Sequence, residues 1–118
     1  MATDIFTALA DPTRRSIVEI LANYDQLPAS EIYENFQVSP QAVSKHLRIL
    51  RESNVVQMEK RAQQRLYRIN KDSLLEMEQW IHNVSHRWTR RLDKLDKVLQ
   101  SGMIQSSIST NEGDDSQS

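Results

Sequence analysis

The chain of 118 residues contains no cysteine, and its only two glycines lie beyond residue 100. Without cysteine there is no disulfide framework, no thiolate metal site and no thiol redox switch. A glycine-rich phosphate loop is therefore excluded from the first hundred residues. The sequence also shows no nucleophile beside a base and no clustered acid pair. These absences argue against an enzyme.

Long apolar runs are also missing, since no stretch approaches the roughly 20 residues that a membrane span needs. The first residues include Asp4 and Asp11 and lack the charged-then-apolar layout of a secretory signal. We therefore expect a cytoplasmic protein with no membrane partner. At this length we expect one domain with one modest core, over residues 1–100. Residues 101–118 are rich in Ser, Gln, Asn, Gly and Asp, which predicts a disordered acidic and polar tail.

The net charge is only −1, but the charges are segregated along the chain. Residues 1–38 carry a net charge of −4, residues 39–71 carry +6, and residues 72–100 are balanced. More than half of the basic side chains thus lie in about a third of the sequence. A localised basic block is typical of a phosphate-binding surface. A solvated helix and hairpin would carry the same charges, so this observation leaves both interpretations open.

Three short helices are predicted in the first part of the chain. Ile5, Phe6 and Leu9 form a helical stripe that ends at Asp11 and Pro12. An aspartate followed by proline begins a second helix, because the carboxylate caps it and the proline needs no N–H at the first position. Apolar side chains recur at helical spacing in the second and third helices, at Ile17, Ile20, Leu21, Ile32 and Phe36.

A fourth helix is predicted to begin at Ser39 and Pro40, which repeat the cap-then-proline start. Val43, Leu47 and Leu50 form a narrow apolar stripe along it. The opposite side carries only cationic or hydrogen-bonding groups, namely Gln41, Ser44, Lys45 and Arg48. Two short helices joined by a brief polar turn are typical of a helix-turn-helix, whose second helix enters the major groove of DNA.

The period changes to two after this helix. Val56 and Met58, and then Tyr67 and Ile69, alternate with polar residues on either side of the segment 61–65. This alternation predicts a β-hairpin. Three helices followed by a basic hairpin form a winged helix-turn-helix, so the expected fold class is mainly α with a small β-hairpin and a long C-terminal helix.

The last helix is predicted to begin after Asn70 and to be unusually long. Its apolar residues step by three or four positions: Leu74, Met77, Ile81, Val84, Trp88, Leu92, Leu95 and Leu99. A helix of this length cannot bury the whole stripe against so small a domain, so we expect it to face a second copy of the chain. The alternative is that the stripe folds back on its own domain.

Three motifs in this order resemble the ArsR/SmtB family of winged-helix regulators. They are Leu9-Ala10-Asp11-Pro12-Thr13-Arg14-Arg15, the recognition-helix pattern from Val38 to Leu50, and Tyr67-Arg68-Ile69 in the returning strand of the hairpin. Trp80, Trp88 and the segment from Arg91 to Leu95 resemble the last helix of a subgroup with no assigned effector. The resemblance implies a symmetric dimer that represses transcription by occupying an operator.

Many members of that family release DNA on binding a metal ion, and here the sequence departs from the pattern. The stretch 29–34 has no cysteine where the family's metal box has two, and Leu74 replaces a histidine ligand of the family's other site. We therefore expect no cofactor and an unknown effector. His82 and His86 have metal-ligand spacing on a helix, which leaves zinc as an alternative to an incidental pair.

The candidate DNA-binding residues come from the fourth helix and the hairpin tip. They are Ser39, Pro40, Gln41, Ser44, Lys45, His46 and Arg48, with Arg61, Gln63, Gln64 and Arg65 from the hairpin. Arginine or lysine pairs with guanine, and glutamine pairs with adenine. His46 lies at the edge of the helix, where packing or a phosphate contact is expected.

The candidate dimer interface consists of Ile5, Phe6, Leu9, Ile81, Val84, Trp88, Leu92, Leu95 and Leu99. Arg14 and Arg15 begin a helix, which is the unfavourable end for cations, so they are expected to have an anionic partner. The sequence predicts a homodimeric transcriptional repressor that binds an inverted-repeat DNA operator. The alternatives are a repressor released by a metal or small ligand, and a winged helix that binds a protein.

Overall fold

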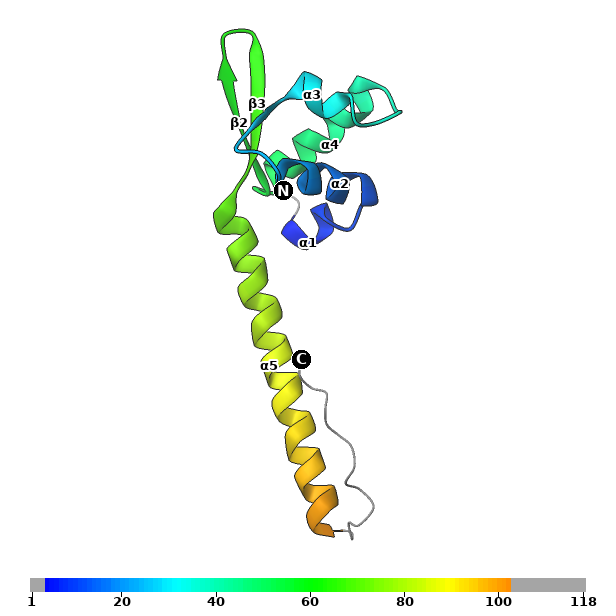
Figure 1. The fold of residues 1–118 in the computed structure, drawn as a ribbon, viewed down its shortest axis with the longest axis vertical. Coiled ribbons are helices and arrows are strands. Elements are labelled where there is room, and N and C mark those ends of the chain that lie inside the picture. The colour runs from blue at the N-terminus through cyan, green and yellow to red at the C-terminus, as the bar shows by residue number, and fades with distance from the viewer. Residues whose placement is uncertain (1–3, 103–118) are drawn as a thin grey trace. The chain divides into compact units, whose positions relative to one another are not determined.

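The computed structural model describes residues 4–102 and contains the predicted winged helix-turn-helix (Figure 1). Its elements are α1 (Ile5–Ala8), α2 (Pro12–Leu21), β1 (Leu27–Pro28), α3 (Ala29–Tyr33), α4 (Pro40–Glu52), β2 (Val56–Arg61), β3 (Gln64–Ile69) and α5 (Lys71–Gly102). The chain forms two compact units that divide between Glu78 and Gln79. Within residues 4–102, no helix combines the length and the apolar character needed to cross a membrane.

Three helices begin at capping side chains, of which Asp11 and Ser39 were predicted and Asp4 was not. The carboxylate of Asp4 accepts from the Thr7 N–H at 2.8 Å, and that of Asp11 accepts from the Arg14 N–H at 3.0 Å. The Ser39 hydroxyl caps α4 in the same way, accepting from the Ala42 N–H at 3.2 Å. Each cap satisfies a donor that has no partner inside its helix. The start of α4, and with it the orientation of its first turn, is therefore fixed locally.

Helix α4 ends in a Schellman motif. The N–H of Val55 bonds to the carbonyl of Leu50 at 2.9 Å, and that of Asn54 bonds to the carbonyl of Arg51 at 3.0 Å. Asn54 has a φ of 64°, which is the left-handed conformation that this motif needs and that asparagine tolerates. Val55 and Leu50 are both fully buried, as is usual for the apolar pair of the motif. The turn thus fixes where strand β2 leaves the recognition helix.

We expect Asn54→Val to destabilise the fold by about 1–2 kcal/mol, because a β-branched residue disfavours positive φ. Asn54→Gly is expected to match the wild type closely. Urea denaturation would measure both. Asn23→Val is the control, since Asn23 follows a helix without a positive φ. Equal losses for Asn54→Val and Asn23→Val would contradict the argument.

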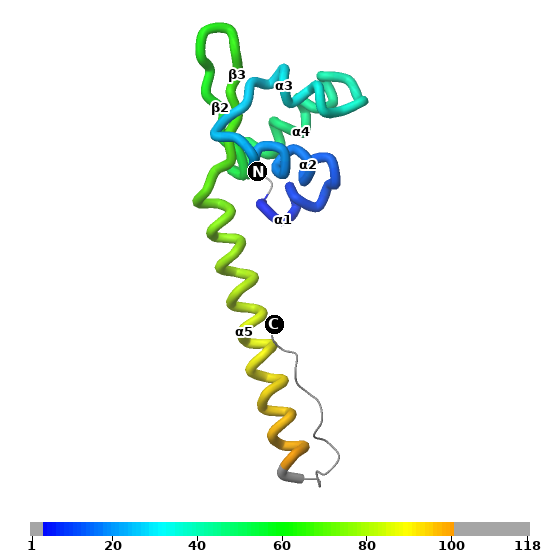
Figure 2. The backbone as a smooth tube through the Cα atoms, in the orientation of Figure 1, coloured from blue at the N-terminus to red at the C-terminus, as the bar shows by residue number. Residues whose placement is uncertain are grey.

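The sheet has three antiparallel strands in the order β1-β3-β2, with the hairpin strands side by side in Figure 2. The predicted hairpin is confirmed, with Val56 opposite Ile69 and Met58 opposite Tyr67. Strand β1 was not predicted. It consists of two residues and contains Pro28, which is tolerated there because β1 is an edge strand. Its pairing of Leu27 with Tyr67 brings the start of α3 beside β3.

The core of the first unit lies between the helices and the sheet. The predicted stripe of α4, Val43, Leu47 and Leu50, is completely buried. The other core residues are Ala8, Ile17, Leu21, Leu27, Ile32, Val55, Val56 and Tyr67. Because this one face of α4 is buried, its polar residues must lie on the surface.

Helix α5 begins at a junction with the end of α4. The side-chain oxygen of Asn70 accepts from the Asp72 N–H at 3.2 Å, while its amide donates to the carbonyl of Asn54 at 2.9 Å. The helix continues to Gly102 and so includes the first two residues of the predicted tail, and residues 103–118 of that tail lie outside the described residues.

Candidate nucleic-acid interface

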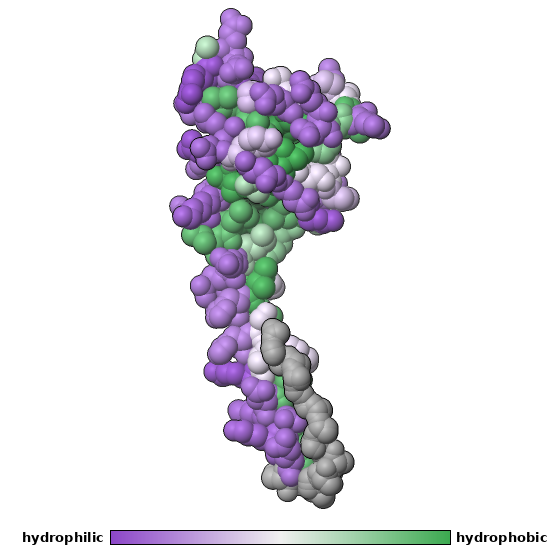
Figure 3. Space-filling view, in the orientation of Figure 1, coloured by the Kyte–Doolittle hydropathy of each residue, from purple (hydrophilic) through white to green (hydrophobic). Residues whose placement is uncertain are grey.

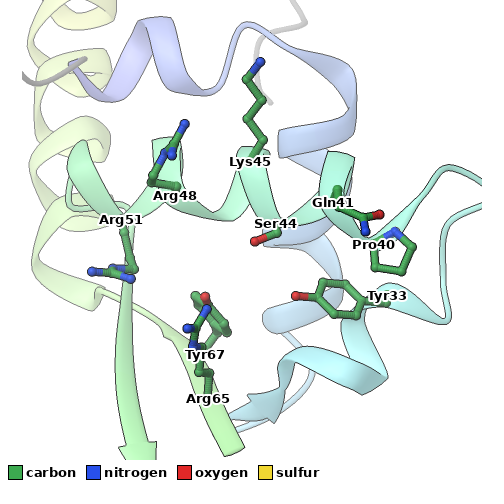
Figure 4. A pocket seen from close by; sticks show the side chains of 9 residues that line it. All are labelled: Tyr33, Pro40, Gln41, Ser44, Lys45, Arg48, Arg51, Arg65 and Tyr67. Carbon is green, nitrogen blue, oxygen red and sulfur yellow. The ribbon is translucent and has the colours of Figure 1, made fainter.

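The exposed side of helix α4 carries two adjacent rows of polar side chains. Gln41, Lys45 and Arg48 form the first row, at positions i, i+4 and i+7. Ser44 and Arg51, seven residues apart, form the second row. In Figure 4, Lys45 and Arg48 extend away from strand β3, whereas the hydroxyl of Ser44 points towards it. The two rows therefore face different surroundings.

A groove of about 610 Å³ lies between helix α4, the end of α3 and strand β3 (Figure 4). It is lined by Tyr33, Pro40, Gln41, Ser44, Lys45, Arg48, Arg51, Arg65 and Tyr67. Six of these nine are predicted DNA-binding residues, five from α4 and Arg65 from the hairpin. The structure thus brings the recognition helix and one arm of the wing to a common surface.

Tyr33, Arg51 and Tyr67 line the groove but were not among the predicted site residues. Helical spacing places Arg51 seven residues after Ser44, so the sequence contained a signal for it. Tyr67 was interpreted only as part of the alternating strand, and Tyr33 had no local signal. Both tyrosines reach the groove through the pairing of β1 with β3, which is a long-range contact.

The four cationic side chains of the groove have no ion pair or side-chain hydrogen bond with any other residue in the described part of the chain. They are Lys45, Arg48, Arg51 and Arg65. None of the described residues that line the groove is acidic. Like-charged groups that are not neutralised locally produce a positive potential that attracts an anionic partner.

Two other arginines of the wing are already engaged. Arg61 bonds to the carboxylate of Glu59 at 3.0 Å, and Arg68 bonds to the side-chain oxygen of Gln57 at 3.1 Å. Gln63 and Gln64 lie at the tip, beside a second hollow of about 350 Å³ that shares Tyr33 and Arg65 with the groove. Of the three wing arginines, Arg65 is therefore the best placed for an outside partner.

His46 is held against helix α2 rather than extended into solvent. Its Nδ1 lies 3.2 Å from Nη1 of Arg14. A guanidinium group can only donate, so a neutral His46 ring accepts this bond at Nδ1 and carries its proton on Nε2. The Asp11 carboxylate, at 3.8 Å from the same nitrogen, is too distant for a hydrogen bond. His46 thus joins α4 to α2, and its Nε2 has no hydrogen bond within the described part of the chain.

The anionic partner expected for Arg14 and Arg15 is found only in part. Arg14 donates from Nε to the carbonyl of Ala8 at 2.6 Å, and Arg15 donates from Nη1 to the carbonyl of Leu9 at 3.0 Å. These carbonyls close the end of helix α1, where the dipole favours cations. The charge of Asp11 is close enough to Arg14 to contribute electrostatically. The sequence pattern could not show that the carbonyls at the end of α1 accept hydrogen bonds from the two arginines at the start of α2.

The Asp11 cap gives a pH-dependent contribution to stability. The hydrogen bond from the Arg14 N–H, and after it the charges of His46 and Arg14, lower the pKa of Asp11 below its usual 3.8. A carboxylate with a depressed pKa in the folded state stabilises the fold above 3.8, and this stabilisation is lost as the pH falls through the folded-state pKa.

We therefore expect Asp11→Ala to cost about 1 kcal/mol of unfolding free energy at pH 7. The difference from wild type should shrink below pH 4. Asp11→Asn, which keeps a capping oxygen, should cost less at pH 7, and its difference from wild type should shrink over the same pH range. Urea denaturation between pH 3 and 7 would test this, with Asp25→Ala as the control for losing an exposed carboxylate. A loss that is independent of pH would contradict the role of the charge.

The second unit contains the histidine pair and the apolar stripe of helix α5. The rings of His82 and His86 stack with centroids 5.9 Å apart. Within residues 4–102, no group of three or more His, Cys, Asp or Glu side chains could hold a metal ion. A hollow of about 450 Å³ lies around Trp88, lined also by Arg91, Leu92, Lys94, Leu95 and Val98.

Comparisons with known proteins agree with this architecture. A family described as a helix-turn-helix domain matches residues 9–59. The transcriptional repressor SdpR of Bacillus subtilis is 34% identical over 80 residues, which cover 68% of this chain and 88% of that protein.

Two solved structures are also similar. An ArsR-like transcriptional regulator from Rhodococcus sp. RHA1 has a TM-score of 0.70 and 29% identity, over 80% of this chain and 88% of that one. A structure described as an ArsR family transcriptional regulator has a TM-score of 0.66 and 28% identity, over 75% of this chain and 97% of that one.

Proposed function

The chain belongs to the ArsR family of winged helix-turn-helix transcriptional regulators, and on this basis we propose that it is a homodimeric repressor of its own or a neighbouring operon. The observation that carries the proposal is the set of four unneutralised cations in the groove between helix α4 and the wing. Duplex DNA is the partner that such a surface fits. In this proposal the protein is not an enzyme. It acts in the cytoplasm.

In this proposal the first row of α4 contacts base edges in the major groove. Arg48 and Lys45 have the donors that guanine accepts, and Gln41 has the donor and acceptor that adenine needs. Ser39 and Pro40 begin the helix and place its N-terminal N–H groups near a phosphate. His46 offers its Nε2–H to the DNA backbone.

The wing tip contacts the minor groove or the flanking backbone through Arg61, Gln63, Gln64 and Arg65. Arg61 must exchange its bond to Glu59 for a phosphate in order to contribute, whereas Arg65 has no such bond to give up. Arg65 is therefore the principal wing contact in this proposal.

The dimer of this proposal forms through helix α5. Of the twelve large apolar side chains that are most exposed, eight lie in residues 79–102: Trp80, Ile81, Val84, Trp88, Leu92, Leu95, Val98 and Leu99. Figure 3 shows polar side chains along one side of this helix and apolar ones beside them. Exposed apolar surface of this extent on one helix is typical of an interface.

The contribution of helix α1 to the dimer is smaller. Ile5 and Leu9 pack against the core of their own unit, and only Phe6 is largely exposed. We therefore propose that α5 supplies most of the interface and that Phe6 supplies its edge. The two recognition helices of a dimer contact half-sites about 34 Å apart, which requires an inverted-repeat operator.

Fluorescence anisotropy on DNA from upstream of the protein's own gene tests this function, with scrambled DNA as the control and at two salt concentrations. We expect binding that is selective for the upstream DNA, weakened by salt and unaffected by zinc. Loss of binding on adding zinc would instead indicate that His82 and His86 act as ligands in a metal-released repressor. Equal affinity for both DNAs at both salt concentrations would contradict an operator in that region.

A further inference from the structure

We propose that the inner part of the groove is a phosphate-binding site built from the hydroxyl groups of Tyr33, Ser44 and Tyr67, with Arg51 and Arg65 beside them. The site holds a phosphate of the DNA backbone where one strand passes between helix α4 and the wing. This inference rests on the proposed DNA-binding function and adds to it residues that do not contact bases.

The strongest observation concerns Tyr67. Its side chain is buried, with only 4% of the residue exposed, yet its hydroxyl makes no hydrogen bond with any residue of the described part of the chain. Buried tyrosine hydroxyls normally have a partner, because an unpaired one costs free energy. Tyr67 is one of the residues that line the groove. The hydroxyl is therefore placed to donate to a group that enters from outside.

Two further hydroxyl groups lie on other elements beside the groove, that of Tyr33 on α3 and that of Ser44 on α4. In Figure 4 the hydroxyls of Tyr33, Ser44 and Tyr67 point into the same space between helix α4 and strand β3. The pairing of Leu27 with Tyr67 positions α3, and so Tyr33, next to β3. The three hydroxyls are thus held by a strand pairing and by the buried stripe of α4, not by flexible loops.

The charge and the donors of this space match a tetrahedral oxyanion. Arg51 lies on the same row of α4 as Ser44, and Arg65 lies on the same face of β3 as Tyr67, since the two are two residues apart. Both arginines lack an ion pair among the described residues. Hydroxyl and guanidinium groups are the donors that bind phosphate oxygens in protein–DNA complexes.

The direction of the side chains separates this site from the base-contacting row. Lys45 and Arg48 extend away from strand β3, whereas the three hydroxyls point into the space between α4 and β3 (Figure 4). A groove of about 610 Å³ also exceeds what a single small anion needs, and it has room for a phosphate with its flanking sugars. We infer that a DNA phosphate, rather than a free phosphate ion, is the principal ligand.

Variants that each remove one donor test the site. Tyr67→Phe, Tyr33→Phe and Arg51→Gln are compared with Tyr24→Phe and Arg68→Gln, which remove a hydroxyl and a charge outside the groove. Anisotropy is measured on upstream and on scrambled DNA. Each groove variant should lose about tenfold or more in affinity on both DNAs, because a bond to a charged phosphate is lost whatever the sequence. The two controls should bind as the wild type does.

Arg51→Gln should also reduce the slope of log K against log salt by about one for each recognition helix on the DNA. Circular dichroism melting shows whether Tyr67→Phe still folds, and the partly exposed Tyr33 and the exposed Arg51 provide variants that leave the core intact. Wild-type affinity in all three variants would overturn the site. Loss on upstream DNA alone would overturn it as well, because that pattern indicates base contact.

A second experiment distinguishes a DNA phosphate from a free phosphate ion as the ligand of this site. Inorganic phosphate is titrated into the protein without DNA and followed by ³¹P line broadening in wild type and Arg51→Gln. Weak broadening that disappears in Arg51→Gln supports the site even if the upstream DNA is not the operator. Tight phosphate binding that displaces scrambled DNA at constant ionic strength would overturn the assignment of DNA as the principal ligand.

Discussion

A Leu92→Glu chain is expected to be monomeric and to lose selective DNA binding by at least about a hundredfold. Leu92 lies in the middle of the exposed apolar stripe of the second unit, with 45% of the residue exposed in the single chain. If that stripe is covered by a second copy, the substitution buries an unpaired carboxylate twice per dimer. Each buried carboxylate costs several kcal/mol. We expect this cost to exceed the free energy that the apolar contacts between the two helices contribute to the dimer.

Sedimentation velocity would measure the mass of the variant, and anisotropy would measure its affinity for upstream and scrambled DNA. The monomer retains one recognition helix and one wing, so weak and unselective binding should persist. Asn83→Glu is the matched control, because Asn83 lies on the opposite side of the same helix, where its side-chain oxygen accepts from Gln79. A Leu92→Glu protein that sediments as a dimer would show that α5 is not the interface.

Much of the first unit was predictable because its signals are local. Asp11-Pro12 and Ser39-Pro40 mark helix starts by cap chemistry alone, and both are confirmed. The alternation of Val56 and Met58 with polar residues predicts the hairpin strand, whereas the pairing register was not predicted. These patterns depend on neighbours within a few residues, which is why a single sequence contains them.

What could not be predicted depends on contacts between distant residues. Strand β1 consists of two residues with a proline, so no alternation marks it, and it exists only because β3 lies beside it. Tyr33 and Tyr67 are 34 positions apart and share a groove through that strand. The bond between Arg14 and His46 likewise joins helices α2 and α4 without any spacing that would reveal it.

The candidate site illustrates the same division. The sequence identifies the polar face of α4 because a buried stripe at helical spacing leaves only one exposed side. The sequence cannot show which cations are neutralised by neighbouring carboxylates. The structure does show this, and it changes which wing residue is expected to contribute most to DNA binding. Arg61 and Arg65 look equivalent in the hairpin tip, but only Arg61 bonds to a carboxylate. Arg65 is thus the wing residue on which the proposal depends.

Arg48→Ala is expected to weaken binding to the operator much more than binding to scrambled DNA. Arg48 is exposed, has no ion pair among the described residues, and extends away from the three hydroxyls of the groove. A good bidentate contact to guanine contributes about 1–3 kcal/mol of discrimination, or about 5- to 150-fold in affinity. A symmetric dimer makes the contact twice, so the loss on the operator should be at least about thirtyfold.

Arg51→Gln is the informative comparison, since it removes a cation from the neighbouring row of the same helix. The two variants should differ in kind: Arg48→Ala lowers the ratio of operator to scrambled affinity, and Arg51→Gln lowers both affinities and leaves their ratio unchanged. Anisotropy at two salt concentrations measures both quantities. If Arg48→Ala lowered both affinities equally, Arg48 would be a phosphate contact, and base recognition would have to come from Gln41 and Lys45.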